Sequence, residues 1–224
     1  MMAERPAFDR KPHDGSPRAG RFAGVLLAGC LSILLASCRN FSVPSSSNVP
    51  TLLVGDIVMA LPFGAGPEAG TPARGDMAVF RLPRDRTTYY IKRVVGLPGD
   101  RIRMRRGRLV INGAEVRREP AGTYPFRDEL GRDRRVPKYV EILPNGSRHE
   151  IIEIQADNGY FDNTDEYVVP AGHYFTMGDN RDNSSDSRDL ASVGYIPGEN
   201  FVAKPWRVLF STAQDHLRLL MSIE

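Results

Sequence analysis

The chain has 224 residues and a mass of 24.9 kDa, which is enough for one medium-sized domain with a hydrophobic core. The 30 Lys and Arg residues exceed the 27 Asp and Glu residues by only three, a balance that does not by itself indicate nucleic-acid binding. Two cysteines and four histidines exclude a disulfide-stapled scaffold and a cysteine-based zinc module, and they leave little for a histidine-rich metal site.

The first distinctive segment spans residues 22–38, FAGVLLAGCLSILLASC, and contains no charged side chain. As a helix it would be about 26 Å long, which is near the lower limit for crossing a bilayer. Cationic side chains precede it, and only Arg39 follows it closely. By the positive-inside rule we expect a cytoplasmic tail at 1–21, a transmembrane anchor at 22–38 and an extracytoplasmic domain at 39–224.

Two other interpretations of the apolar segment remain open. A cleaved secretory signal peptide has a similar length and similar flanks. The run Leu35-Ala36-Ser37-Cys38 also resembles the acylation motif of lipoproteins, in which Cys38 would carry the lipid. All three interpretations put residues from 39 onward on the same side of the membrane.

After this segment, short runs of β-branched and aromatic residues alternate with turn residues. This pattern predicts a mainly β domain built from antiparallel sheets, with a hairpin insertion around 112–165. The predicted strands are 52–60, 77–82, 88–97, 108–111, 139–143, 148–154, 167–169, 173–177 and 201–210.

Two Asn-Gly pairs and one C-terminal segment refine this prediction. Asn112-Gly113 and Asn145-Gly146 each lie between predicted strands and favour two-residue hairpin turns. Residues 213–222, AQDHLRLLMS, have the composition of a short helix.

Four polar clusters follow the apolar segment, and each has an ordinary explanation when taken alone. The serines of 44–56 are typical of a linker, and 74–80 is typical of a turn that enters a strand. In 90–100 the adjacent cations Lys92 and Arg93 would extend from a strand into solvent. Residues 178–188 suggest a calcium loop, but the EF-hand glycine and glutamate are missing from the register, so a loop held by ion pairs fits better.

Together, in this order and spacing, the clusters resemble the sequence boxes of the bacterial type I (leader) signal peptidase family. The boxes read PSSSNVPTL, RGDMAVF, YIKRVVGLPGD and GDNRDNSSDSR, and the resemblance extends over about residues 20–211. Two positions depart from the family pattern. Asn48 stands where the family usually has Met, and Ser46 stands where Gly is common.

The resemblance implies roles for particular residues. Ser47 matches the nucleophile, and Lys92 matches the general base. The supporting residues that it implies are Ser45 in the oxyanion hole, Ser184 as the group that orients the lysine, and Asp186 and Arg188 as a structural ion pair.

A serine–lysine dyad is also reasonable from the chemistry of the residues. A serine hydroxyl needs a base within hydrogen-bonding reach, and no histidine lies in any of the four boxes. A lysine can act as the base only when it is neutral, and burial among apolar side chains lowers its pKa. Tyr90, Ile91 and Val94 would provide such surroundings for Lys92.

The resemblance therefore implies a membrane-bound serine endopeptidase that removes signal peptides from exported preproteins through an acyl-enzyme. The expected substrates have small residues at positions −3 and −1, and no metal or other cofactor is expected. The enzyme would be monomeric and would reside in the bacterial inner membrane with its catalytic domain on the periplasmic side. Membrane lipid and preproteins are the expected partners, and nucleic acid is not.

Alternatives of other kinds stay open. A catalytically impaired, membrane-anchored β-domain that binds exported peptides is favoured only by Asn48. A peptidase dedicated to a single substrate would share the same chemistry. The arginines of 101–108 fit either the solvated face of a hairpin or a contact with anionic lipid.

Overall fold

The computed structural model describes residues 38–63, 70–127, 131–155, 158–212 and 218–223. Residues Ser37–Glu224 form one compact unit. The predicted tail at 1–21 and all but the last residue of the predicted anchor at 22–38 lie outside the described residues. Within the described ranges, no helix combines the length and apolar character needed to cross a membrane.

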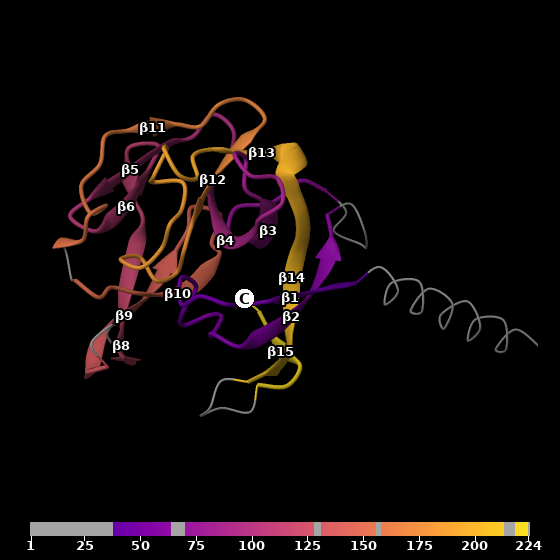
Figure 1. The fold of residues 1–224 in the computed structure, drawn as a ribbon. Helices are drawn as coiled ribbons and strands as arrows, with labels where there is room; N and C mark the ends of the chain where they lie inside the picture. The colour runs from indigo at the N-terminus through magenta and orange to yellow at the C-terminus, as the bar shows by residue number, and fades with distance from the viewer. Residues whose placement is uncertain (1–37, 64–69, 128–130, 156–157, 213–217, 224) are drawn as a thin grey trace, which may run out of the picture. The chain divides into compact units, whose positions relative to one another are not determined.

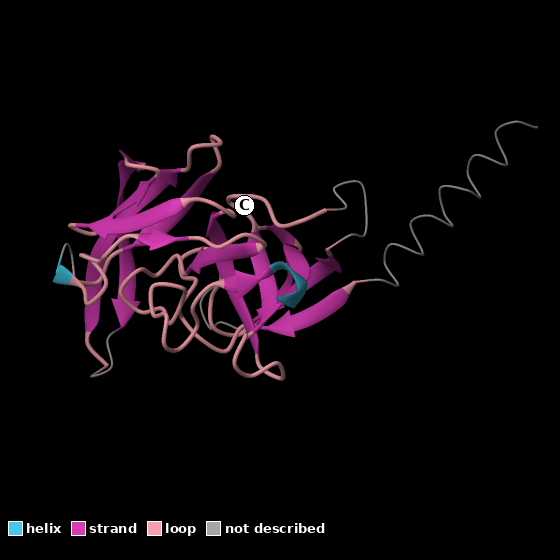
Figure 2. Ribbon diagram, turned by 90° about the horizontal axis from the view of Figure 1, so that it is seen from above, coloured by secondary structure: helices cyan, strands magenta, loops and turns pink. Residues whose placement is uncertain are grey.

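Strands make up nearly all of the regular structure, as Figure 2 shows, and the described residues contain no α-helix. The mainly β prediction is therefore confirmed. The elements are β1 (Arg39–Ser42), β2 (Asp56–Pro62), β3 (Met77–Arg81), β4 (Tyr89–Gly96), β5 (Arg101–Arg105), β6 (Arg108–Ile111), β7 (Ala114–Glu115), β8 (Arg117–Arg127), β9 (Asp133–Ile142), β10 (Arg148–Ile152), β11 (Tyr167–Val168), β12 (His173–Met177), β13 (Ile196–Pro197), the 3₁₀ turn η2 (Gly198–Asn200), β14 (Phe201–Ser211) and β15 (Met221–Ser222).

The strands form three sheets. The largest has the order β1-β2-β14-β3-β4-β12-β13, and β15 pairs with β14. A sheet of order β10-β9-β8 and another of order β11-β5-β6-β7 lie on the other side of β4 and β12 from β2 and β14 (Figure 1). All pairings between the named strands are antiparallel.

Strand β4 is buried on both faces. Its side chains alternate as the sequence predicts, so Val94 packs in one core cluster with Phe80, while Val95 packs in another with Phe175. Both valines are fully buried. Any polar side chain from the middle of β4 must therefore lie in a largely apolar environment.

The two Asn-Gly hairpins differ in their turns. Asn112 and Gly113 both have positive φ angles and join β6 to β7 directly, as predicted. The second hairpin joins β9 to β10, but its loop covers residues 143–147 and is not a two-residue turn. Leu143 is buried in the core and Asn145 donates a hydrogen bond to the Arg74 carbonyl, so packing outside the hairpin sets the wider loop.

The helix predicted at 213–222 is wrong where the structure describes it. Residues 221–222 form the edge strand β15, in which Met221 pairs with Val208 of β14. The main-chain pairing available at the edge of the sheet outweighs the weak helical propensity of this segment. Residues 213–217 lie outside the described part.

Candidate active site

Ser47 lies in a turn that connects β1 to β2. We call residues 44–55 the serine turn. Its ends are held together because Val43 N–H donates to the Asp56 carbonyl and Gly55 N–H donates to the Val43 carbonyl, both at 2.9 Å. Inside it, Leu52 is fully buried and Ser47 is only 6% exposed. The linker interpretation of these serines is therefore wrong, because buried apolar residues fix the turn.

Lys92 lies on β4 and points toward this turn. Its Nζ donates a hydrogen bond of 2.6 Å to Ser47 Oγ, and it lies 5.4 Å from the centre of the Tyr90 ring. The side chain is 4% exposed. The interpretation of Lys92 and Arg93 as cations that reach solvent is thus wrong for both, since Arg93 is 1% exposed.

Burial lowers the pKa of Lys92 from 10.5 to about 8. The carboxylates of Asp186 and Asp179 act in the opposite direction by favouring the ammonium form, and Arg188 adds to the lowering. A free amine is therefore accessible at mildly alkaline pH, within hydrogen-bonding distance of a serine hydroxyl. This arrangement can remove a proton from serine, which is the first requirement of a serine nucleophile.

The two other serines named from the sequence lie nearby. Ser45 Oγ is 3.2 Å from Ser47 Oγ and is on the exposed side of the turn. The hydroxyl of Ser184 is buried beside Gly178, and among the described residues no hydrogen bond joins it to Lys92. The structure therefore brings Ser45, Ser47 and Lys92 together, with Ser184 adjacent but not bonded to the lysine.

The segment after β12 forms hydrogen bonds with the serine turn. Asn180 donates its backbone N–H to the Ser47 carbonyl and its side-chain amide to the Ser46 carbonyl, both at 3.1 Å. Thr51 Oγ1 donates to Asp179 at 2.5 Å. Sequence reasoning missed Thr51 and Asn180, although both belong to the recognised boxes.

Gly178 allows this close approach. A Cβ at this position would overlap the Ser47 carbonyl oxygen and the side chain of Ser184. Gly178→Ala is expected to push the serine turn away from β12, to destabilise the fold by about 1–3 kcal/mol and to lower any activity that depends on Ser47 at least tenfold. Thermal unfolding and an assay of that activity measure these effects.

Gly198→Ala is the matched control, because a Cβ there meets its neighbours only at 3.4 Å or more. Equal activities of Gly178→Ala and Gly198→Ala would contradict the steric role of Gly178.

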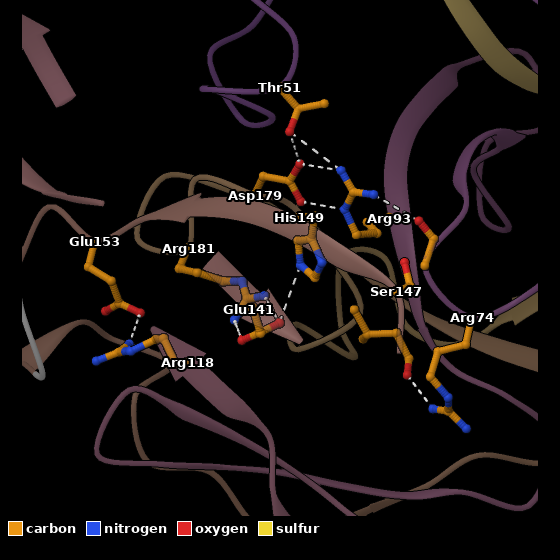
Figure 3. A network of polar contacts seen from close by, with 12 residues as sticks. Thr51, Arg74, Arg93, Arg118, Glu141, Ser147, His149, Glu153, Asp179 and Arg181 are labelled. Carbon is orange, nitrogen blue, oxygen red and sulfur yellow. Dashed lines mark hydrogen bonds and ion pairs between the residues drawn. The ribbon is translucent and has the colours of Figure 1, made fainter. Parts of the chain in front are cut away.

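Two buried ion pairs flank the turn. Arg93 of β4 binds Asp179 through Nε at 2.9 Å and through a second nitrogen at 2.8 Å (Figure 3). Asp186 and Arg188 form a similar pair, with two contacts of 2.8 Å. Two-point contacts of this kind fix the relative orientation of two side chains. The first pair therefore joins Asp179 to β4, and the second stabilises the segment 179–188 internally.

A second buried network extends from this region toward β9 and β10. Arg181 binds Glu141 at 2.9 and 2.5 Å, and His149 Nε2 lies 3.3 Å from the same carboxylate (Figure 3). Burial, followed by the nearby Arg93, lowers the pKa of His149. Glu141 and His149 lie outside the recognised boxes, and no local pattern distinguishes them from the exposed charges of a hairpin.

A cavity of about 410 Å³ opens over the serine and lysine. Its lining includes Ser45, Ser47, Asn48, Ile91 and Lys92. A larger cavity of about 650 Å³ is lined by Arg74, Lys204 and Trp206 but contains neither Ser47 nor Lys92. The smaller cavity is therefore the candidate substrate site.

Among the described residues, one acidic group could hold a metal ion. Glu153, Asp162 and Asp182 each offer a carboxylate oxygen within 4.8 Å of the others. Glu153 is paired with Arg118 at 2.7 Å, while burial raises its pKa to about 8. The Arg118 guanidinium occupies one side of this group, and the raised pKa leaves Glu153 largely protonated near neutral pH, so neither feature favours a metal ion there.

Comparisons with known proteins show which family this chain belongs to. The family model described as "Signal peptidase, peptidase S26" matches residues 18–209. Signal peptidase I of Rickettsia canadensis (strain McKiel) is 33% identical over 231 residues, which cover 92% of this chain and 84% of that protein. Signal peptidase I of Rickettsia prowazekii (strain Madrid E) is 35% identical over 216 residues, or 86% of this chain and 79% of that protein.

A solved structure is also similar. The crystal structure of a signal peptidase I from Enterococcus faecalis V583 has 24% sequence identity and a TM-score of 0.34, and covers 59% of this chain and 94% of that chain. The family match and the curated relatives show that this chain is a hydrolase of the serine protease class. The chain belongs to the signal peptidase family, peptidase S26.

Proposed function

We propose that this enzyme removes signal peptides from exported preproteins with Ser47 as the nucleophile and Lys92 as the general base. The observation that carries the proposal is the 2.6 Å hydrogen bond from Lys92 Nζ to Ser47 Oγ inside a cavity. The burial that lowers the pKa of Lys92 to about 8 supports the role of base.

In the acylation step, the neutral Lys92 amine accepts the Ser47 proton while Oγ attacks the carbonyl carbon at the cleavage site. Ser45 and the Ser47 backbone N–H stabilise the oxyanion, a contribution of about 3 kcal/mol for each donor in comparable enzymes. The C–N bond then breaks, and the Lys92 ammonium protonates the departing amine. The signal peptide remains attached to Ser47 as an ester.

In the deacylation step, Lys92 accepts a proton from water as the water oxygen attacks the ester carbon. The bond from the carbon to Ser47 Oγ breaks, and Lys92 returns the proton to Oγ. The signal peptide leaves with a free carboxylate, and both residues regain their starting state.

The substrate binds in an extended conformation. On the side away from β3, β12 pairs only with Arg93–Gly96 of β4, so no described strand pairs with the earlier part of β4 on that side. Tyr89, Tyr90 and Ile91 from this part also line the cavity. An extended peptide can add to such an edge through main-chain hydrogen bonds, and a small cavity favours small residues at −3 and −1.

The anchor at 22–38 keeps the catalytic domain at the periplasmic surface of the bacterial inner membrane, where preproteins are held by their own apolar segments. The enzyme acts as a monomer and contacts membrane lipid. A catalytically impaired peptide-binding protein is the second candidate, and the specific observation that favours it is Asn48 in place of the usual Met.

The deciding experiment is a processing assay. The full chain in detergent is incubated with a preprotein that has Ala at −3 and −1, and the new N-terminus is sequenced. Cleavage after the Ala at −1 is expected. A folded enzyme that binds the preprotein but leaves it intact would favour the second candidate.

The pH dependence of processing follows from the protonation state of Lys92. Since only the neutral amine can accept the serine proton, kcat/KM is expected to rise about tenfold per pH unit toward the Lys92 pKa of about 8 and to level off above it. Initial rates between pH 6 and pH 10, at substrate concentrations below KM, measure the profile. A profile that is flat or falls over this range would exclude Lys92 as the base.

A further inference from the structure

Asn48 follows the proposed nucleophile and departs from the family pattern. It is 2% exposed, and its Nδ2 donates a hydrogen bond of 2.7 Å to the main-chain carbonyl of Ile91. Ile91 immediately precedes Lys92 on β4. Two consecutive residues of the serine turn therefore contact two consecutive residues of β4.

The two contacts constrain each other. Lys92 reaches Ser47 through a long side chain that could adopt several rotamers, so its hydrogen bond alone does not set the separation of the two segments. The Asn48 amide has only two rotatable side-chain bonds and binds the main chain of β4 directly. It therefore holds the backbone of the serine turn at a defined distance from the strand that carries Lys92.

The other contacts of the turn reach β4 less directly or reach a different segment. Asn180 binds the carbonyls of Ser46 and Ser47 from the segment after β12, and Thr51 reaches Arg93 of β4 at 3.4 Å and through Asp179. Neither reaches the carbonyl next to Lys92.

Asn48 also keeps a polar atom buried without compensation. Among the described residues, its Oδ1 has no hydrogen-bond partner. A buried unpaired acceptor is unfavourable for folding, and an apolar side chain would avoid it. The amide donor toward Ile91 is the feature of Asn48 that an apolar residue cannot supply.

We propose that Asn48 is a positioning residue that sets the Ser47–Lys92 contact by tying the serine turn to the Ile91 carbonyl. This inference rests on the proposed dyad. It explains how the chain can be active without the usual Met: Asn48 replaces packing by a hydrogen bond to the strand that carries the base.

Variants of matched shape test this role. Asn48→Leu removes both polar atoms at nearly constant size, and Asn48→Asp puts an acceptor where the donor was. Both are expected to lower kcat for a preprotein with Ala at −3 and −1 at least tenfold while KM changes less than threefold. Should neither fold, Asn48→Ala, which also removes the amide donor, is measured in their place with the same expected fall in kcat.

Asn200→Leu is the control. Asn200 is also buried and donates through Nδ2 to a strand carbonyl, that of Arg81, at 2.9 Å. It is expected to lower the thermal midpoint while kcat stays within threefold of wild type. If Asn48 had only a structural role, the Asn48 variants and Asn200→Leu would instead show losses of kcat in proportion to their losses of thermal midpoint.

The inference is overturned if a folded Asn48 variant retains more than a tenth of the wild-type kcat, or if Asn200→Leu loses kcat to the same extent. The proposed dyad fails in a different way, when Ser47→Ala or Lys92→Met still cleaves the preprotein. Ser47→Ala measured beside the Asn48 variants therefore separates the two failures.

Discussion

Lys92→Met is expected to abolish preprotein processing and, at the same pH, to stabilise the fold. Processing stops because no other described side chain hydrogen-bonds to Ser47 Oγ as a base. Removing one member of a catalytic unit typically costs a factor of about 10³ or more in kcat. Single-turnover cleavage of a preprotein and urea unfolding of the same samples measure both effects.

The stabilisation follows from proton linkage. The pKa of Lys92 is about 8 in the folded chain and 10.5 as the reference, so the folded state disfavours the ammonium below pH 8. That difference corresponds to about 3 kcal/mol of folding free energy, which Lys92→Met recovers below pH 8. The gain shrinks as pH rises from 8 to 10.5, because the unfolded chain then loses its proton too.

Ser47→Ala provides the comparison. It should lose activity to the same extent without a comparable gain in stability, since no buried charge is removed. A Lys92→Met protein that is inactive but less stable than wild type at pH 7 would contradict the linkage, even though it would agree with the catalytic role.

Glu141→Gln is expected to destabilise the fold by about 3–5 kcal/mol, because it leaves Arg181 buried without its counter-charge. Burial alone would raise the pKa of Glu141, but the Arg181 guanidinium outweighs it and holds that pKa well below the usual range. The carboxylate is therefore ionised in the native state at all ordinary pH values. Urea unfolding at pH 7 measures the loss.

The Glu115→Gln variant is the control for a charge at the surface. Glu115 pairs with Arg105 at 3.3 Å, and both side chains are largely exposed. Removing the Glu115 charge should lower the free energy of unfolding by less than about 1 kcal/mol. If the two variants were equally stable, the buried network would contribute no more than a surface pair.

The sequence predicts best those strands whose pattern is local. Strands β3, β6 and β12 lie within one or two residues of their predicted ranges, because each is a short apolar run bounded by turn residues. No strand is predicted within the charged stretch 117–138, yet it forms β8 and much of β9. Main-chain pairing joins the two strands, and Tyr124, Phe126 and Val136 pack in one hydrophobic cluster. These few apolar side chains are spread over two charged segments, so no local apolar run marks the strands.

The sequence by itself determined the family, the order of the four boxes and the identity of the candidate serine and lysine, because these depend on residue types at fixed spacings. Only the tertiary structure decided that Lys92 and Arg93 are buried, that Glu141 neutralises Arg181, and that Asn48 binds the Ile91 carbonyl. These contacts join residues about 40 positions apart in the chain. The pKa of a lysine, like the position of a serine turn, depends on what surrounds it in space, and no local pattern encodes those surroundings.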